Sequence, residues 1–303
     1  MTATATMSGV LTPVVTPFDD DLKPDAARLL KQCQWLQSNN CGLAIFGTNS
    51  EGNSMSTAER IMLMEALVEG GIDAAQLMPG TGCCALTDSV ELSKRAVELG
   101  CGGVLMLPPF YYKGADDDAL YRSYAEIIQR VGDDKLKIYL YHIPQVSNVP
   151  ITLTLIEKLV KDFPDTVVGI KDSSGDWSNT KAMLDTFPGF GVFAGSETFL
   201  LQNMRNGGVG CISATANINP GAIHNLYETW QNDDADDQQA RLDTVRGVFE
   251  GFPMIPAMKA AIAHFAGDGV WKNVRPPLMN LSDEATNKLL ENLDRISFKI
   301  EGV

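Results

Sequence analysis

The sequence is poor in the residues that bind metal ions and nucleic acids. It has three histidines and six cysteines among 303 residues, and no two cysteines are spaced as CxxC. Because zinc sites are built from such Cys and His pairs, we expect no metal. Cys83 and Cys84 are adjacent, a poor geometry for a structural disulfide, so the thiols favour a reduced cytoplasm. Lys and Arg number 24 against 38 Asp and Glu, and the net charge of −14 argues against nucleic acids and anionic membranes as partners.

Long apolar runs are also missing. No stretch approaches the roughly 20 apolar residues that a membrane span needs. The first ten residues, MTATATMSGV, lack the basic and then apolar pattern of a secretory signal. Since 45% of the residues are hydrophobic, the chain can still bury a sizeable core, and its length suits one large barrel or two average domains.

Short apolar runs alternate with longer segments of helical period. The candidate strands are Val10–Val15, Leu43–Phe46, Gln76–Pro79, Gly103–Leu107, Lys137–Tyr141, Val167–Lys171, Gly191–Ala194 and Gly210–Ser213. Such alternation indicates parallel strands joined by right-handed crossovers, and eight units predict an α/β fold, a (β/α)8 TIM barrel. The alternative, an open doubly wound sheet, is disfavoured because no GxGxxG follows the first strand.

Beyond Pro220 the pattern is helical throughout. The predicted helices are Ala222–Asn232, Asp236–Phe252, Ile255–Phe265 and Asp283–Ile296. We therefore expect a barrel over residues 1–225 and a C-terminal helical extension, 226–303, packed on it. Earlier in the chain, STAER (Ser56–Arg60) and TDSVE (Thr87–Glu91) each predict a helix start with a Thr cap.

Lys171 closes a candidate strand, at the barrel end where active sites form. Desolvation there would lower the pKa of its amine, which could then form a Schiff base with a carbonyl substrate. The alternative is a structural lysine paired with Asp172 or Glu197, and position alone leaves both open. Tyr141 ends the preceding strand, so its phenol would lie beside Lys171 and could shuttle protons, although a core tyrosine fits the same position. His142 faces the other side by alternation and is interpreted as packing.

Five motifs occur in order at the predicted strand ends: GTNSE, PPFYYK, YHIP, GIKDSSGD and GCISATAN. Together they resemble the dihydrodipicolinate synthase / N-acetylneuraminate lyase family of pyruvate-dependent class I aldolases. The likeness runs from GVLTPVVTPF to VRPPL, nearly the whole chain.

This resemblance implies a homotetrameric barrel that needs no metal or organic cofactor. Lys171 matches the Schiff-base lysine and Tyr141 the proton-relaying tyrosine. Thr48 and Asn49 match the loop that binds the keto-acid carboxylate. Tyr111 matches a tyrosine that reaches into a neighbouring subunit's site, and the pocket-lining positions are matched by Gly195 and Ile212.

Two positions depart from the synthase pattern. The synthase has an arginine two residues past the proline of YHIP, where this chain has Val146, which cannot bind a carboxylate. In the carboxylate loop, Asn49-Ser50 replaces Thr-Gly, and a Ser in place of Gly alters the backbone angles that are accessible.

The predicted function is a Schiff-base lyase or aldolase acting on pyruvate or a related 2-keto acid. The second-substrate region, with Val146, Ser196, Glu197 and Ala214, is more neutral than the synthase's and suits an aldehyde or a 2-keto-3-deoxy sugar acid bound by Ser196 and Glu197. The alternatives are the synthase of lysine biosynthesis, a non-catalytic keto-acid sensor, and a phosphate-binding barrel isomerase. The last would need a Gly-rich loop after strands 7 and 8, where AGSETF and ISATAN stand instead.

Overall fold

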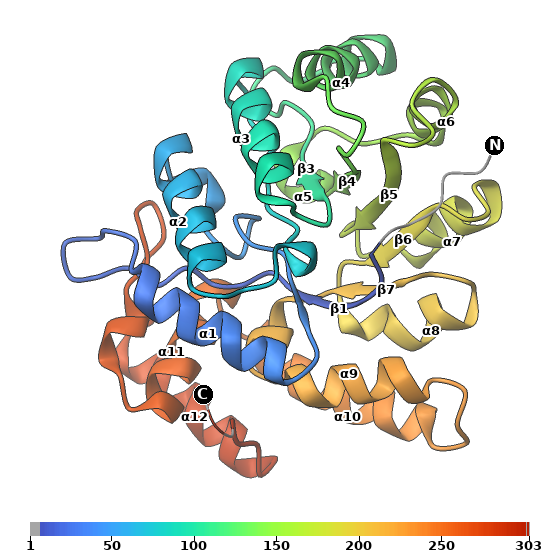
Figure 1. The fold of residues 1–303 in the computed structure, drawn as a ribbon. Coiled ribbons are helices and arrows are strands. Elements are labelled where there is room, and N and C mark those ends of the chain that lie inside the picture. Colours follow the sequence, from blue (N-terminus) through green and yellow to red (C-terminus); the bar gives the residue numbers. More distant parts are fainter. Residues whose placement is uncertain (1–6, 301, 303) are drawn as a thin grey trace.

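A seven-stranded, entirely parallel sheet forms the centre of the molecule, and it curls in space (Figure 1). The computed structural model describes residues 7–300 and 302. The strand order is β2-β1-β7-β6-β5-β4-β3. The strands are β1 (Gly9–Thr12), β2 (Gly42–Leu43), β3 (Val104–Met106), β4 (Ile138–His142), β5 (Val167–Asp172), β6 (Gly191–Ala194) and β7 (Gly210–Ile212).

One of the eight predicted strands, Gln76–Pro79, is not a regular strand. Gln76 ends a 3-10 turn, Ala74–Gln76, and the residues after it make two isolated parallel bridges, Leu43↔Leu77 and Gly80↔Leu105. Pro79 has no N–H to donate to a continuous ladder. Because Leu43 and Leu105 belong to β2 and β3, this segment lies between the two edge strands of the sheet.

Helices follow the strands and lie around the outside of the sheet (Figure 1). They are α1 (Ala26–Ser38), α2 (Thr57–Glu69), α3 (Leu86–Leu99), α4 (Asp117–Val131), α5 (Pro144–Ser147), α6 (Leu153–Asp162), α7 (Trp177–Thr186), α8 (Leu200–Arg205) and α9 (Pro220–Thr229).

The two predicted helix caps are wrong in detail. Ser56, not Thr57, caps α2. It forms a capping box with Glu59, in which the side chain of each residue accepts a hydrogen bond from the backbone N–H of the other. Helix α3 already starts at Leu86, with Ala85 at the N-cap and no side-chain hydrogen bond there. Thr87 therefore lies inside the first turn of α3.

The C-terminal helices are α10 (Ala235–Glu250), α11 (Met254–Ala266) and α12 (Asp283–Arg295), each within two residues of its predicted bounds. They share an apolar core that includes Phe249, Met258 and Leu289, all fully buried. Helix α9 spans the predicted boundary at residues 225 and 226. The division into barrel and extension remains a prediction.

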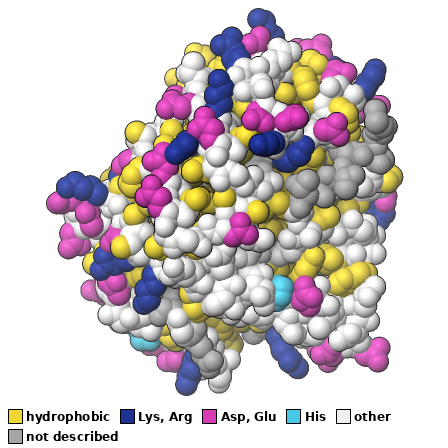
Figure 2. Space-filling model, in the orientation of Figure 1, with side chains coloured by type: hydrophobic (Ala, Val, Ile, Leu, Met, Phe, Trp, Pro, Cys, Tyr) yellow, Lys and Arg dark blue, Asp and Glu magenta, His cyan; other side chains and the backbone are white. Residues whose placement is uncertain are grey.

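Among the residues that the structure describes, no helix is long and apolar enough to cross a membrane, and no cluster of His, Cys, Asp and Glu could hold a metal ion. All six cysteines are free. On the face drawn in Figure 2, acidic and basic side chains are interspersed rather than segregated by sign.

Candidate functional site

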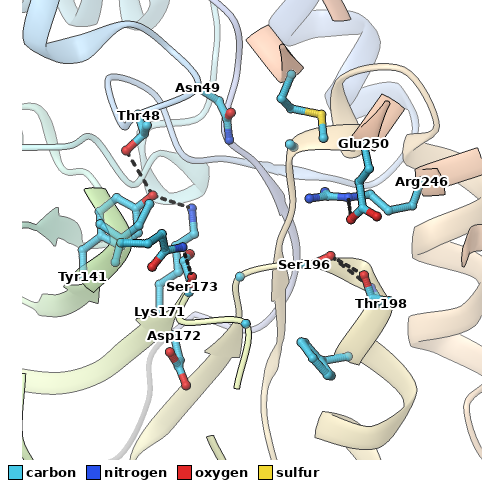
Figure 3. Close-up of a pocket in the computed structure, with 17 residues that line it drawn as sticks. Thr48, Asn49, Tyr141, Lys171, Asp172, Ser173, Ser196, Thr198, Arg246 and Glu250 are labelled. Atoms are coloured by element: carbon cyan, nitrogen blue, oxygen red, sulfur yellow. Dashed lines mark hydrogen bonds and ion pairs between the residues drawn. The ribbon is translucent and has the colours of Figure 1, made fainter. Parts of the chain in front are cut away.

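A cavity of about 480 Å³ opens beyond the carboxyl ends of the strands (Figure 3). One wall carries Lys171, Tyr141 and the loop residues Thr48 and Asn49. The opposite wall carries side chains of the C-terminal helices, among them Arg246. Two different sets of elements therefore build the two ends of the cavity.

Lys171 lies on β5 and is 2% exposed, although its residue type is normally solvated. The parallel ladder pairs Lys171 with Tyr141 on β4. As a result, Lys171 Nζ lies 3.4 Å from Tyr141 Oη and 4.5 Å from the centre of the same ring. The electron-rich face of the phenol stabilises a cation at this distance.

Tyr141 connects Lys171 to the loop after β2. Its hydroxyl lies 3.2 Å from Thr48 Oγ1, and either oxygen can donate. The phenol can thus exchange a proton with the amine on one side while a hydroxyl holds it on the other. This Thr48–Tyr141–Lys171 chain joins three predicted site residues in one set of contacts (Figure 3).

The neighbouring carboxylate of Asp172 does not pair with Lys171. It accepts hydrogen bonds from Ser174 N, Asn179 Nδ2 and Thr180 Oγ1, at 2.7 to 3.0 Å. Within the described part of the chain, Lys171 makes no ion pair, so the proposed structural partnership with Asp172 or Glu197 is not formed.

His142 has the packing role expected for it. Its Nδ1 accepts a hydrogen bond of 3.0 Å from Ile151 N, which places the proton on Nε2 when the ring is neutral. Burial lowers the pKa of His142, and the Asp172 carboxylate opposes this shift. The neutral form of the imidazole is therefore favoured in the folded protein, where its role is structural.

The loop that carries Thr48 and Asn49 has an unusual backbone. Phe46 and Glu51 have positive φ angles, 62° and 55°, in the left-handed region that non-glycine residues rarely adopt. Ser50 itself has no positive φ, and Thr16 Oγ1 donates to its carbonyl at 2.7 Å. Strain of this kind persists only where the surroundings fix it.

A buried ion pair supplies part of that restraint. Lys259 of α11 lies 2.7 Å from Glu51 Oε1, and both side chains are fully buried. The other oxygen of Glu51 accepts from Arg275 N at 2.8 Å. The C-terminal helices thus hold the loop that carries Thr48 and Asn49.

Gly195 and Ser196 follow β6 and line the cavity, as expected. A Cβ atom on Gly195 would lie 2.6 Å from the Asp172 carbonyl oxygen and still closer to Ser173 Oγ. Glycine is required at this position because the backbone at the end of the neighbouring strand, β5, passes so near.

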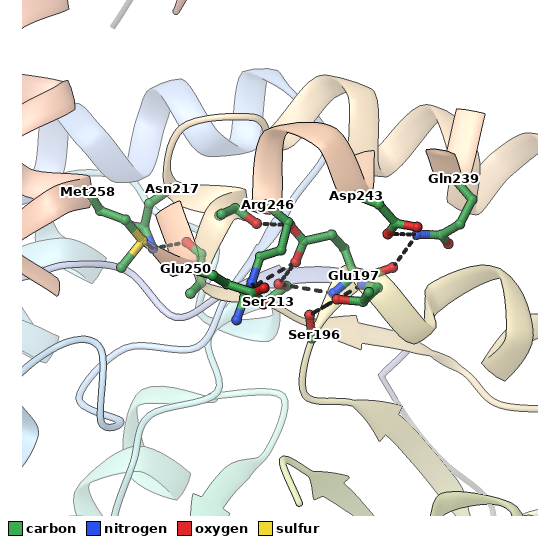
Figure 4. A network of polar contacts seen from close by, with 12 residues as sticks. Ser196, Glu197, Ser213, Asn217, Gln239, Asp243, Arg246, Glu250 and Met258 are labelled. Carbon is green, nitrogen blue, oxygen red and sulfur yellow. Dashed lines mark hydrogen bonds and ion pairs between the residues drawn. The ribbon is translucent and has the colours of Figure 1, made fainter. Parts of the chain in front are cut away.

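Four other predicted positions lie outside the cavity wall. Ile212 is buried in the core with Tyr139 and Phe193. The Glu197 carboxylate is 2% exposed and accepts hydrogen bonds from Ser213 and Thr215 (Figure 4). Tyr111, 73% exposed, stacks edge-on against Tyr112, and Val146 on α5 is 58% exposed. In this chain, Val146 does not line the cavity.

Two charged residues of the cavity were missed in the sequence. Arg246 and Glu250 lie one turn apart on α10 and point into the cavity opposite Lys171 (Figure 3). Their spacing at i and i+4 is equally typical of a surface ion pair. The predicted second-substrate region, which includes Ser196 and Ala214 of the cavity wall, therefore also has a guanidinium and a carboxylate beside it, and its neutrality relative to the synthase stays a prediction.

Comparisons with known proteins agree with these observations. A model of the dihydrodipicolinate synthetase family matches residues 6–296. An uncharacterized DapA-like lyase of Chloroflexus aurantiacus is 34% identical over 291 residues, 95% of this chain and 96% of its own. The crystal structure of dihydrodipicolinate synthase from Agrobacterium tumefaciens has a TM-score of 0.89 at 28% identity, covering 96% of this chain and 100% of that one. YagE, a prophage protein of E. coli K12 crystallised in complex with pyruvate, has a TM-score of 0.88 at 24% identity, covering 96% and 99%, and shows the shared fold.

Proposed function

The chain belongs to the dihydrodipicolinate synthetase family and is a lyase, and on that premise we propose that it forms a Schiff base with pyruvate or another 2-keto acid. The observation that carries this proposal is the buried amine of Lys171 held 3.4 Å from the Tyr141 hydroxyl.

The reaction starts when the neutral amine of Lys171 attacks the keto carbon. Tyr141 delivers a proton to the carbinolamine hydroxyl, which leaves as water, and the bond between nitrogen and carbon becomes an imine. Loss of a proton from the neighbouring carbon gives an enamine that can attack an aldehyde. In the reverse direction, the imine accepts the electron pair of the carbon–carbon bond that breaks. The Thr48 hydroxyl keeps the phenol of Tyr141 in place for both proton transfers.

The keto-acid carboxylate is assigned to the loop with Thr48 and Asn49, whose hydroxyl and amide can donate to its oxygens. The far part of the substrate is assigned to the region of Ser196 and Glu197. We infer a hydroxylated partner there, in a 2-keto-3-deoxy sugar acid or a similar hydroxy-keto acid. The synthase of lysine biosynthesis is the less favoured alternative, because Val146 stands where its arginine would be.

The proposal extends to the architecture. The bridges of Leu77 and Gly80 support a sheet that closes as a (β/α)8 TIM barrel over residues 1–225, with 226–303 as its helical extension. The family resemblance supports a homotetramer in the cytoplasm in which Tyr111 reaches a neighbouring subunit's site. Its 73% exposure leaves it accessible for such a contact.

Trapping the imine tests the chemistry. Incubation with pyruvate and borohydride should reduce the imine and add to the peptide that contains Lys171 the mass of the keto acid less one oxygen atom, because water leaves and two hydrogens are added. The variant Lys171→Met should show no adduct, whereas Lys137→Met, which changes a half-buried lysine that donates to the Asp134 and Asp165 backbone carbonyls, should react normally. An unmodified Lys171 in the wild type would refute the Schiff base. Turnover of an aldol product then separates an enzyme from a sensor that only binds keto acids.

A further inference from the structure

The guanidinium of Arg246 is held by two carboxylates and also faces the cavity. Its Nε donates to Glu250 Oε1 at 2.9 Å, and its Nη1 lies 3.5 Å from Glu197 Oε2. Nη1 is buried yet makes no hydrogen bond within the described residues. Only 16% of the side chain is exposed, so the guanidinium is fixed by its neighbours and faces the cavity (Figure 3).

Glu197 explains why the guanidinium stays where it is. Both of its oxygens already accept hydrogen bonds, from the Ser213 and Thr215 hydroxyls (Figure 4). Gln239 Nε2 of α10 also donates to the Glu197 backbone carbonyl at 3.0 Å. Glu197 therefore compensates the charge of Arg246 from the side of the buried Nη1, and Nη2, for which the described residues supply no hydrogen bond, remains available as a donor.

The charges around Arg246 select against a second anion. Two carboxylates, Glu197 and Glu250, flank the one guanidinium, so the group as a whole carries an excess negative charge. A carboxylate placed there would lie near both, and like charges at short range repel. A neutral ligand meets no such penalty.

Arg246 and Glu250 form an ion pair that presents a donor, the guanidinium, beside an acceptor, the carboxylate. Glu250 is half exposed, and only its Oε1 is engaged with Arg246 in the described chain. Two adjacent hydroxyls match this arrangement, because one can accept from Nη while the other donates to the carboxylate. The hydroxyls of Ser196 and Thr198 lie on the same side of the cavity and can bind a further one.

We propose that Arg246 and Glu250 are the specificity residues of this site and bind a neutral vicinal diol at the far end of the substrate. The proposal rests on the Schiff-base function, because Lys171 fixes the keto end at the opposite wall (Figure 3). It names the substrate class: a hydroxy-keto acid whose distal end carries neighbouring hydroxyls and no second acid group.

Three aldehydes test this in the addition of pyruvate: glyceraldehyde, which has a diol, propionaldehyde, which has the same chain without hydroxyls, and succinic semialdehyde, which ends in a carboxylate. The wild type should have its highest kcat/KM with glyceraldehyde. Hydrogen bonds to charged groups predict a loss of about 10- to 100-fold for glyceraldehyde in Arg246→Lys and Glu250→Gln. Propionaldehyde should change less than about threefold, because it makes neither bond.

Arg241→Lys is the matched control, since Arg241 is exposed on the same helix, and it should leave all three values unchanged. Glu250→Gln alters a largely exposed side chain, so it keeps the test valid if Arg246→Lys fails to fold. Equal losses with glyceraldehyde and propionaldehyde, or a wild-type preference for succinic semialdehyde, would overturn the diol assignment.

Borohydride trapping with pyruvate separates the two levels of the proposal. A normal adduct on Lys171 in the wild type and both variants, together with the shifted aldehyde preference, supports the assignment. A normal adduct without any preference for the diol refutes the role of Arg246 and Glu250 alone. No adduct in the wild type overturns the Schiff-base function and the diol assignment with it.

Discussion

Replacing Lys259 with methionine should weaken both the fold and the binding of the keto acid. Lys259 Nζ lies 2.7 Å from Glu51 Oε1 and 4.7 Å from the centre of the Phe18 ring, and neither charged side chain is exposed. Methionine matches the aliphatic part of lysine but not its charge. The buried carboxylate of Glu51 would then keep one hydrogen-bond donor among the described residues, the backbone N–H of Arg275.

The size of the effect follows from this burial. Removing one partner of a buried ion pair costs about 3–5 kcal/mol of the free energy of unfolding. With an unfolding entropy of about 2.1 cal/mol/K per residue, such a loss should lower the Tm of this chain by about 5–8 °C. Because Glu51 closes the loop with a positive φ, the loss should also disorder Thr48 and Asn49 and raise KM for the 2-keto acid.

Thermal unfolding followed by circular dichroism, at one fixed protein concentration, measures the first effect, and steady-state kinetics measures the second. Lys272→Met, on an exposed position of the 3-10 turn Gly269–Lys272, is the control and should behave as the wild type. Adding Glu51→Gln to Lys259→Met removes the unpaired charge, so it should recover at least about half of the lost stability. A Tm for Lys259→Met within about 2 °C of the wild type would refute the reasoning.

Two further predictions concern the residues beside Lys171. Tyr141→Phe keeps the ring over the amine but removes the hydroxyl, so the rate of imine trapping with pyruvate should fall about 10²- to 10⁴-fold at unchanged Tm; a normal rate would exclude Tyr141 as the proton donor. Burial lowers the pKa of His142 in the folded protein, so as pH falls the imidazole is protonated in the unfolded chain before it is protonated in the folded one. The free energy of unfolding should therefore decline below about pH 6.5. His142→Asn keeps an acceptor for Ile151 N but has no group that titrates in this range. Measured by urea unfolding, the free energy of unfolding of this variant should fall less steeply between about pH 7 and 5 than that of the wild type, and equal slopes would show that His142 does not cause the decline.

The strands were predictable wherever a short apolar run is buried on both faces. Gly191–Ala194 agrees at both ends with β6, and β5 is one residue longer than predicted. Every residue of both strands is buried, which is what a continuous apolar run indicates in a parallel sheet. Gln76–Pro79 has only two apolar residues before its proline, and Pro79 with the preceding 3-10 turn interrupts the ladder; the proline was a local signal against a regular strand.

The reacting end of the site was predictable for a related reason. Lys171 and Tyr141 end consecutive strands, and consecutive strands of a parallel sheet are usually neighbours, so their contact follows from topology. The far end depends on where α10 packs, and the amphipathic pattern of a helix indicates only that one face is buried. Nothing in the sequence around Arg246 specifies that this face meets the ends of β6 and β7.

The C-terminal helices consequently contribute more to the site than packing. Helix α11 fixes the carboxylate loop through Lys259 and Glu51, and α10 places Arg246 at the other end of the cavity. The strands supply the amine and the phenol, whose positions are set by a register that tolerates little change. Side chains on α10 can vary without disturbing that register, because they reach the cavity from outside the sheet. Under the proposed function, the chemistry and the choice of substrate are therefore controlled by separate elements of this fold, and substitutions on α10 should change specificity while Lys171 still forms the Schiff base.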